Sequence, residues 1–374
     1  MDDIVVLGAG YAGMATAIQL AARNRGDFRV TLVDAHERFT ERLRLPMTAT
    51  GQQTASLSIP GLLCGTGARF VRGRVTSVDL GARTVVLDHG TITFDLLVYA
   101  LGSVADASSV TGAADHAYTL NGVAEAARLA DRLGSARQVV VGGTGLTGVE
   151  SAAEIASRFP SLRVTLVGRT APGMSLNAKA GAYLRGALDR LGVVYEAGEI
   201  RNVLADAVVV DDATLPADVF VWAGGTRVPV LAEGIATDAR GRMVTDSVLR
   251  SVSHPFVYAA GDAAAIRQPY GIMHGTCQSG MPTGVHAAVS IVRSRRGREP
   301  RPFRFGYYHT PISLGRDDAV VQFTHGDDTP RRLHLTGRAA VRYKETVTAA
   351  PWPTYRRMKR LPASGAFWPK GRRA

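Results

Sequence analysis

The sequence predicts an α/β protein that contains two copies of one strand–turn–helix–strand unit. Two glycine-rich stretches carry this prediction, IVVLGAGYAG at residues 4–13 and QVVVGGTGLTG at residues 138–148. In each copy an apolar strand enters a glycine turn, a helical pattern follows, and a second strand comes after it, RVTLVD at 29–34 and RVTLV at 163–167. Strands that alternate with helices in this way predict parallel sheets with helices on their faces.

Length and composition fit a globular protein of two or three domains. The chain has 374 residues, of which 46% are hydrophobic and 20% charged. No apolar run reaches the roughly 18 residues that a membrane-spanning helix needs. The start, Met-Asp-Asp, lacks the basic residues of a secretory signal. We therefore expect a cytoplasmic protein, with a peripheral membrane contact as the alternative.

Cysteine usage argues against thiol and metal chemistry. The chain has two cysteines, Cys64 and Cys277, which form no CxxC or similar pair. The sequence therefore offers no redox-disulfide motif and no cysteine zinc site, and we expect no bound metal.

The net charge of +12 is concentrated toward the C-terminus. No acidic residue follows Glu345, whereas seven basic residues do: Arg356, Arg357, Lys359, Arg360, Lys370, Arg372 and Arg373. Such a tail could contact an anionic membrane surface, an acidic protein or another polyanion, or form a solvated end. Nucleic-acid binding is not expected because no recognition motif accompanies the charge.

The first glycine turn has the spacing of a dinucleotide site. Gly8 permits the tight turn, Gly10 lets backbone approach a pyrophosphate, and Gly13 lets the helix, expected over 14–25, pack on the strand. The helix N-terminus offers N–H groups to phosphate, and Asp34 can accept hydrogen bonds from a ribose.

The second turn repeats this spacing with Gly143, Gly145 and Gly148, before a helix expected over 149–157. Aligning the two VTLV strands places Gly168 where Asp34 stands in the first copy, and Arg169 follows. Without the acid, the site can accept a 2′-phosphate, which a guanidinium would bind, so NADPH is favoured over NADH. An exposed arginine that ignores the phosphate is the alternative.

A further repeat follows each unit. FDLLVYALGS at 94–103 and ADVFVWAGGT at 217–226 are apolar strands that end in small residues, among them Ala100, Gly102 and Gly224. Small residues at a strand end leave room for a cofactor to pass close to the backbone.

A last strand, HPFVYAAGDAAA at 254–265, ends in Gly261 and Asp262, and a helix is expected from about 272. With these motifs, residues 1 to about 300 resemble the two-dinucleotide-binding-domain flavoproteins of the pyridine nucleotide-disulfide oxidoreductase family. The resemblance implies that the first turn holds FAD, with Asp262 on its ribitol. It also implies that the second turn holds NAD(P)H, whose nicotinamide reaches the flavin.

The resemblance implies a fold of two Rossmann-like domains, with the NAD(P)-binding domain inserted in the FAD-binding domain and a small C-terminal α+β segment. The expected boundaries are 1–108 and 229–303 for the FAD domain, 109–228 for the NAD(P)H domain and 304–374 for the C-terminal part.

Within the family, the chain is most similar to the type II NADH dehydrogenases. Residues 35–51 lack the cysteine pair of the disulfide reductases. GTGLTGVESAAEIA with its Glu150, ISLGRDDAVVQF at 312–323 and LTGRAAVRYKE at 335–345 resemble dehydrogenase segments. However, TCQSGMP at 276–282 departs from the AQxxxQ element beside the quinone. This departure puts a membrane quinone in doubt, so we expect a small-molecule acceptor, either quinone-like or a metabolic intermediate, and the chain could form a homodimer.

Other functions remain open at this point. They are a ferredoxin–NAD(P) reductase-like protein, an apoptosis-inducing-factor-like redox protein, a flavin-dependent tailoring enzyme of secondary metabolism, and a redox-sensing binding protein.

The candidate residues fall into two groups. The expected catalytic residues are Glu150, Arg44, Cys277 and Gln278, with His274 as a further proton donor. Glu150 is expected in the first turn of its helix, where it orients the nicotinamide or relays a proton, or else stabilises the helix. Arg42 and Arg44 could face the flavin or pair with Glu150. The expected cofactor-binding residues are Gly8, Gly10, Ala12, Gly13, Asp34, Arg42, Val75, Ala100, Gly102, Gly143, Gly145, Leu146, Gly148, Arg169, Gly224, Gly261, Asp262 and Gln278.

Overall fold

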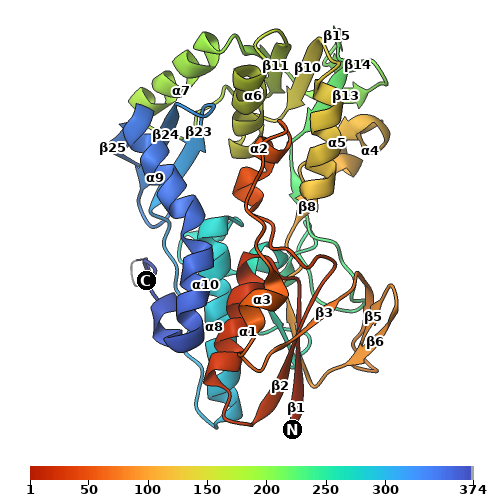
Figure 1. The fold of residues 1–374 in the computed structure, drawn as a ribbon, viewed down its shortest axis with the longest axis vertical. Coiled ribbons are helices and arrows are strands. Elements are labelled where there is room, and N and C mark those ends of the chain that lie inside the picture. The colour runs from red at the N-terminus through yellow and green to blue at the C-terminus, as the bar shows by residue number, and fades with distance from the viewer. Residues whose placement is uncertain (372–374) are drawn as a thin grey trace.

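Two five-stranded parallel sheets form the frame of the computed structural model, which describes residues 1–371 (Figure 1). The first sheet has the order β19–β7–β1–β2–β3 and the second the order β12–β11–β10–β16–β9. The strands of the first are β1 (Asp2–Leu7), β2 (Phe28–Asp34), β3 (Arg69–Arg72), β7 (Leu96–Tyr99) and β19 (Val257–Ala259). Those of the second are β9 (Ala117–Tyr118), β10 (Gln138–Gly142), β11 (Arg163–Gly168), β12 (Val194–Ala197) and β16 (Val219–Trp222).

The repeat extends beyond the glycine turns. A three-stranded antiparallel sheet follows β3 of the first sheet and β12 of the second, and the chain then returns to each parallel sheet as β7 or β16. The first small sheet consists of β4 (Val75–Asp79), β5 (Thr84–Leu87) and β6 (Gly90–Thr93), and the second of β13 (Ile200–Val203), β14 (Ala207–Val210) and β15 (Ala213–Pro216). Sequence patterns did not predict these hairpins, because each strand is only four or five residues long.

Helices cover the sheets, and three of them begin elsewhere than the sequence predicted. Helix α1 (Tyr11–Arg23) and helix α6 (Leu146–Arg158) begin three residues earlier, so that Gly13 and Gly148 lie inside them. Helix α8 (Cys277–Arg295) begins later than expected because Thr276 caps it. The Thr276 hydroxyl accepts a hydrogen bond from the Ser279 N–H, and the Ser279 hydroxyl accepts one from the Thr276 N–H. The other helices before residue 277 are α2 (Leu45–Thr48), α3 (Ile59–Leu63), α4 (Ala113–His116), α5 (Val123–Leu133) and α7 (Ala178–Arg190).

The C-terminal segment is an α+β unit that joins the two halves. It consists of β23 (His309–Ser313), β24 (Ala319–Thr324), β25 (Pro330–Thr336), α9 (Gly337–Ala349) and α10 (Pro351–Arg360). Its sheet lies near α6 and α7, and α10 packs against α1 (Figure 1). Short two-residue strands complete the fold: β8 (Val104–Ala105), β17 (Thr226–Arg227), β18 (Met243–Val244), β20 (Ala264–Ala265), β21 (Arg267–Gln268) and β22 (Gly271–Ile272).

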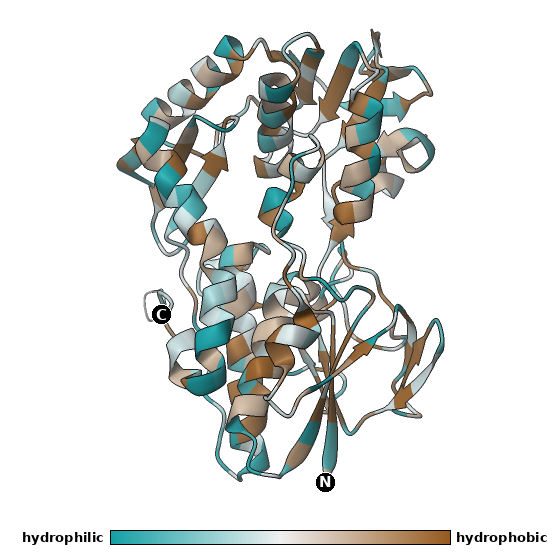
Figure 2. Cartoon of the chain, in the orientation of Figure 1, coloured by the Kyte–Doolittle hydropathy of each residue, from teal (hydrophilic) through white to brown (hydrophobic). Residues whose placement is uncertain are grey.

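The core follows the apolar strands. All four residues of β7 and of β16 are buried, as expected of parallel strands covered on both faces. The central strands are accordingly hydrophobic along most of their length in Figure 2. This arrangement confirms the predicted class, two dinucleotide-binding units of parallel α/β type with a C-terminal α+β segment.

Glycines on α8 bring it against α1. A Cβ atom at Gly284 would lie 2.0 Å from the carbonyl oxygen of Ala12, and one at Gly280 would lie 3.0 Å from the Cβ of Tyr11. Thr16 also donates a hydrogen bond to the Gly284 carbonyl across the contact. The backbone of α8 can therefore approach α1 only while both positions lack a side chain.

We predict that Gly284→Ala destabilises the protein by about 1–3 kcal/mol, because the added methyl forces two buried helices apart. The matched control is Gly186→Ala in α7, where a Cβ would lie 3.6 Å from the Arg190 guanidinium, an ordinary contact. That change should leave stability unchanged or raise it by about 0.5–1 kcal/mol. Thermal unfolding measures both, and equal stability of the two variants would contradict the prediction.

Candidate functional site

The first glycine turn leaves one open position between two tight ones. Gly8 has φ of +90°, and a Cβ atom there would lie 2.5 Å from the Ala100 carbonyl oxygen. A Cβ at Gly13 would lie 1.8 Å from the Gly8 carbonyl oxygen, whereas one at Gly10 would meet nothing within 4 Å. The turn therefore packs tightly on its protein side and presents bare backbone at the N-terminus of α1, which suits a phosphate group.

Two polar groups beside this turn fit a nucleotide. The Asp34 carboxylate, at the end of β2, accepts hydrogen bonds from Ala9 N at 2.7 Å and His36 N at 2.8 Å. The hydroxyl of Tyr11, next to Gly10, is buried and has no hydrogen-bond partner among the described residues. An unpaired buried hydroxyl is costly, and a bound cofactor could supply its partner. The residues present therefore fit a dinucleotide.

The loops after β7 and β19 meet at the carboxyl edge of the first sheet. Here the Asp262 carboxylate accepts a hydrogen bond from the Ser103 hydroxyl at 2.9 Å, and Arg42 donates to the Ser103 carbonyl at 3.1 Å. Gly102, with φ of +69°, has open space around it, and Gly261 has φ of +68°. Crevices at this edge of an open parallel sheet are the usual place for a ligand.

The segment before α8 closes against Asp262. A Cβ atom at Gly275 would lie 2.2 Å from an oxygen of the Asp262 carboxylate, so this position has no room for a side chain. The neighbouring His274 ring stacks on Tyr307 with centroids 4.3 Å apart and pairs with Asp328 at 3.4 Å. Burial lowers the pKa of His274, against the pull of the Asp328 carboxylate. These contacts give His274 a structural role in holding the segment, and proton donation by it stays a prediction.

The second turn reproduces the geometry of the first. A Cβ atom at Gly148 would lie 1.7 Å from the Gly143 carbonyl oxygen, while one at Gly145 would meet nothing within 4 Å. Leu146, the first residue of α6, is 42% exposed. Arg169 is also exposed, immediately after the end of β11. We call each glycine turn, together with the helix N-terminus that follows it, a cradle: residues 8–13 form the first cradle and residues 143–148 the second. The second cradle is therefore open to solvent at its helix N-terminus.

The remaining cofactor candidates lie around these two cradles. Ala12 packs beneath Gly261, where a Cβ would approach it to 3.0 Å, and Val75 begins β4 just beyond the end of β3. Gly224 follows Trp222, whose indole fills the space a Cβ at Gly224 would need. Direct contact of these three residues with a cofactor stays a prediction.

Glu150 lies deeper than the sequence suggested. It is the fifth residue of α6, not part of the first turn, and only 7% of it is exposed. One oxygen of its carboxylate accepts hydrogen bonds from Ser313 N at 2.9 Å and from the Lys344 ammonium. The side chain therefore connects the second unit to both β23 and α9 of the C-terminal segment.

Charged side chains continue from this pair toward the surface. Arg44 pairs with Glu345 at 3.0 Å and with Glu41 at 3.5 Å, so the expected partner Glu150 is replaced by two other carboxylates. Burial lowers the pKa of Lys344, and the nearby Arg44 charge lowers it further, while Glu345 raises it. A lysine whose pKa moves toward that of an adjacent carboxylate is a group that can exchange a proton near neutral pH.

Cys277 and Gln278 begin α8 close to Asp262. Burial, with the Asp262 charge, raises the pKa of the Cys277 thiol to about 12, which outweighs the opposite effect of a helix N-terminus. The thiol is therefore protonated at neutral pH, which argues against thiolate chemistry. The Gln278 amide donates to the His309 carbonyl at 2.9 Å and accepts from Tyr308 N at 3.2 Å. Both of its ends thus bind the start of the C-terminal segment.

The architecture and these sites match one family. A sequence model of the pyridine nucleotide-disulphide oxidoreductases matches residues 2–290. The chain belongs to this family. It is 28% identical to an NADH dehydrogenase-like protein of Mycobacterium tuberculosis, over 93% of each chain. It is 27% identical to the type II NADH:quinone oxidoreductase of Staphylococcus haemolyticus, over 92% of this chain and 93% of that one.

A solved structure shares the whole fold. NDH2 from Plasmodium falciparum, in complex with NADH, superposes with a TM-score of 0.81 over 97% of this chain and 98% of that chain, at 14% identity. The protein is thus an oxidoreductase similar to the type II NADH dehydrogenases. Its two cysteines are both free, so it lacks the dithiol after which the family is named.

Several residues of the oxidoreductase's site were missed from the sequence. Lys344, Ser103 and Thr283, whose hydroxyl accepts a hydrogen bond from Gly261 N at 2.9 Å, were not candidates. Lys344 could have been found, because it lies between the small residues Ala340 and Thr348 at four-residue spacing, on the buried face of α9. Ser313 contributes only its backbone N–H, and a sequence pattern does not reveal such a contact.

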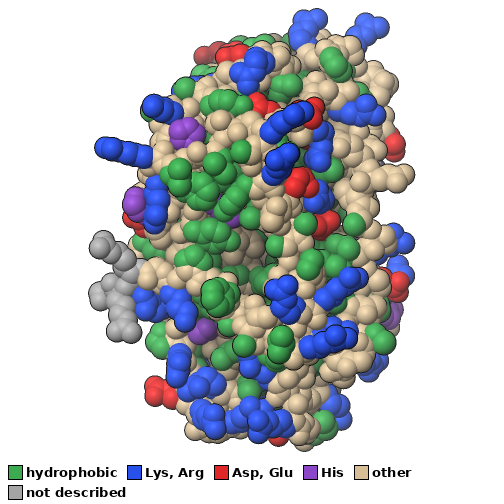
Figure 3. Space-filling view, turned by 60° about the vertical axis from the view of Figure 1, so that its left-hand side comes forward, with side chains coloured by type: hydrophobic (Ala, Val, Ile, Leu, Met, Phe, Trp, Pro, Cys, Tyr) green, Lys and Arg blue, Asp and Glu red, His purple; other side chains and the backbone are tan. Residues whose placement is uncertain are grey.

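A basic groove runs between α10 and α3. It encloses about 800 Å³ and has no acidic residue in its lining, which is Ser56, Leu57, Ser58, Gly61, Leu62, Trp352, Arg356, Arg357, Lys359, Arg360 and Leu361. Basic side chains are also spread over the face shown in Figure 3. The groove therefore attracts anions, by an interaction that salt screens. Arg372 and Arg373 lie outside the described residues, and the partner of the tail stays a prediction.

Among residues 1–371, no helix combines the length and the hydrophobicity that a membrane span requires. No group of three or more histidine, cysteine, aspartate or glutamate side chains in that range could hold a metal ion.

We predict that Lys344→Met destabilises the protein by about 3–5 kcal/mol, because it leaves the Glu150 carboxylate buried without a cation. The double variant Glu150→Gln, Lys344→Met should lose less than the two single variants together, since neither charge is then stranded. Urea unfolding at pH 7 measures each loss. As a control, Arg201→Met removes the exposed ion pair with Glu199 and should cost less than about 1 kcal/mol. Additive losses for the double variant would show that the two side chains are not coupled.

Proposed function

We propose that this protein is an FAD-dependent NAD(P)H oxidoreductase that passes electrons from NAD(P)H through the flavin to a small, quinone-like acceptor. The observation that carries the proposal is the pair of equivalent glycine cradles in one chain, each with bare backbone at a helix N-terminus. The similarity to NADH:quinone oxidoreductases and to an NADH complex supports the assignment of the coenzyme and the acceptor class.

The first cradle suits FAD and the second suits the nicotinamide coenzyme. Only the first cradle has a carboxylate at the end of its second strand and a further carboxylate, Asp262, on the loop after β19. Asp34 would bind the adenosine ribose and Asp262 the ribitol, each as a hydrogen-bond acceptor. FAD supplies the hydride-accepting ring, and the protein binds and orients it.

In the second cradle we propose a modest preference for NADPH over NADH. Gly168 brings no carboxylate to the ribose, and the exposed Arg169 stands next to it. One charge-assisted contact at an exposed site is worth roughly tenfold in affinity.

Glu150 and Lys344 would hold and release the protons that reduction of the acceptor consumes. The pair is buried and lies where α6 meets β23 and α9, apart from the cradle at the start of α6. Reduction of a quinone-like acceptor consumes protons as well as electrons, and a buried carboxylate–ammonium pair can hold and release one. Arg44 and Glu345 extend the charged chain from this pair to more exposed positions.

We predict that the purified protein carries FAD and that Asp262→Ala weakens FAD binding at least about tenfold, through the loss of a charged hydrogen-bond acceptor. Flavin absorbance per protein after desalting measures retention. Asp115→Ala, on the exposed surface of α4, is the control and should keep its flavin. A wild-type protein that binds no FAD under any condition would refute the proposed function. Full FAD retention in Asp262→Ala would refute the ribitol contact alone.

We predict that Glu150→Gln slows oxidation of the reduced protein by a water-soluble quinone about 10- to 100-fold, because the variant cannot hold the proton. Anaerobic reduction by NADH or NADPH should change much less. Stopped-flow absorbance separates the two half-reactions. Glu154→Gln is the matched control, since Glu154 lies one turn further along α6, is also buried, and accepts a hydrogen bond from the Gln52 amide at 2.5 Å. A loss confined to the reduction step would assign Glu150 to the nicotinamide instead.

A further inference from the structure

The two glycine cradles share one backbone, so their side chains can be compared position by position. The first glycine of each turn donates a hydrogen bond to the strand beside it at the same distance, 2.8 Å from Gly8 to Val33 and from Gly143 to Val167. The strand registers agree as well, with Leu7 opposite Val33 and Gly142 opposite Val167. Position 144 is therefore the spatial counterpart of position 9, and position 168 that of position 34.

These two pairs of positions are filled in opposite ways. In the first cradle the small Ala9 leaves room for the Asp34 carboxylate, which accepts a hydrogen bond from Ala9 N. In the second, the larger residue is on the turn: a Cβ atom at Gly168 would lie 2.8 Å from Cγ2 and 2.9 Å from Oγ1 of Thr144. The Thr144 side chain thus occupies the start of the path that an acidic side chain at 168 would take.

The surroundings of Thr144 favour an anion. Its hydroxyl lies 3.5 Å from the hydroxyl of Thr170, and Thr170 and Arg169 are both exposed. The acid on the neighbouring strand, Glu196, is opposite Val167 and not opposite Gly168. Since side chains alternate along a strand, Glu196 belongs to the face of the sheet opposite that of position 168. Two hydroxyl groups therefore lie beside the place where the first cradle has a carboxylate, and the exposed Arg169 stands between Gly168 and Thr170 in the chain.

We infer that Thr144 is the residue that determines coenzyme specificity, and that Thr144, Arg169 and Thr170 together form a subsite for the 2′-phosphate of NADPH. The inference rests on the proposed function, since it assigns the second cradle to a nicotinamide coenzyme. Thr144 acts in two ways. It excludes the carboxylate that would bind the ribose 2′-hydroxyl of NADH, and it offers a hydroxyl to the phosphate.

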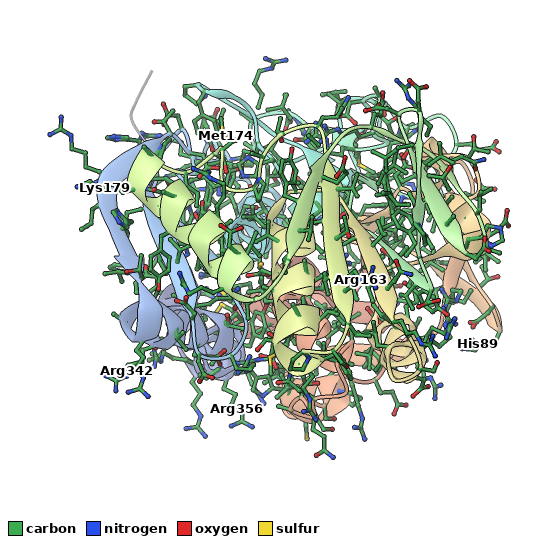
Figure 4. All side chains as sticks on the ribbon, turned by 90° about the horizontal axis from the view of Figure 1, so that it is seen from above. His89, Arg163, Met174, Lys179, Arg342 and Arg356 are labelled. Carbon is green, nitrogen blue, oxygen red and sulfur yellow. The ribbon has the colours of Figure 1, made fainter. Side chains whose placement is uncertain are left out.

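The test compares two fragments of the coenzymes on the FAD-loaded protein. Adenosine 2′,5′-bisphosphate carries the 2′-phosphate, and adenosine 5′-monophosphate lacks it, so calorimetric titration of each reports the subsite without catalysis. The wild type should bind the bisphosphate roughly tenfold more tightly. Arg169→Ala should remove this difference and leave binding of the monophosphate unchanged. The control is Arg163→Ala, at the exposed first residue of β11 (Figure 4), which should change neither affinity.

The decisive variants restore the acid. The double variant Thr144→Ala, Gly168→Asp recreates the Ala9–Asp34 arrangement. It should bind the monophosphate more tightly than the bisphosphate, and NADH should reduce its flavin faster than NADPH does. Gly168→Asp alone should bind the monophosphate less well than the double variant, because Thr144 still blocks the acid. If Gly168→Asp does not fold, Thr144→Ala alone should still lose part of the bisphosphate preference.

Three results would overturn the inference. They are a wild type that does not prefer the bisphosphate, a Thr144→Ala variant with unchanged preference, and a Gly168→Asp variant that matches the double variant. In each of these the cradle still binds nucleotide, so the proposed oxidoreductase function stands, although the first result would also remove the proposed preference for NADPH. Failure of both fragments and of both coenzymes to bind would instead refute the proposed function, and the inference with it.

Discussion

The close contact between each glycine turn and the helix that follows it is the constraint on which the structure depends. At Gly13 and Gly148 a side chain would run into the carbonyl of the first glycine in the turn, so each helix can begin directly above its strand only with glycine there. That contact fixes where the helix N-terminus points, and the open middle glycine then leaves backbone N–H groups free. Both cradles follow from this single packing arrangement.

A buried ion pair gives the C-terminal segment its place relative to these cradles. Lys344 on α9 reaches Glu150 on α6, and the same glutamate accepts the backbone N–H of Ser313. At the first dinucleotide unit, the Tyr355 hydroxyl of α10 donates a hydrogen bond to the Tyr11 carbonyl at 2.9 Å. Removing a single partner of a buried pair strands a charge, so the Glu150–Lys344 contact favours one arrangement of the two elements. The C-terminal segment thus bridges both dinucleotide units.

The fold was predictable from the sequence to the extent that local patterns determine it. Glycine spacing and apolar strands located both parallel sheets, because each signal lies within one short stretch. The start of α8 was not predicted correctly, since the Thr276 cap competes with an apolar segment just before it. Contacts between distant segments were also missed: Arg44 forms an ion pair with Glu345, and Lys344 forms one with Glu150. Such partners depend on how α9 packs, and no pattern near residue 44 or 150 contains that information.

The two cradles differ at the first residue of their helices in a way that suits two kinds of ligand. Tyr11 is only 7% exposed, packed edge-on against Phe39 at a centroid distance of 5.1 Å. Leu146, its counterpart, is 42% exposed. A ligand beneath a covered helix end leaves only when packed aromatic side chains move, whereas a ligand at an open end can exchange freely. The proposed assignment, a permanently held flavin at the first cradle and an exchanging coenzyme at the second, is consistent with this asymmetry, although the backbones of the two turns are alike.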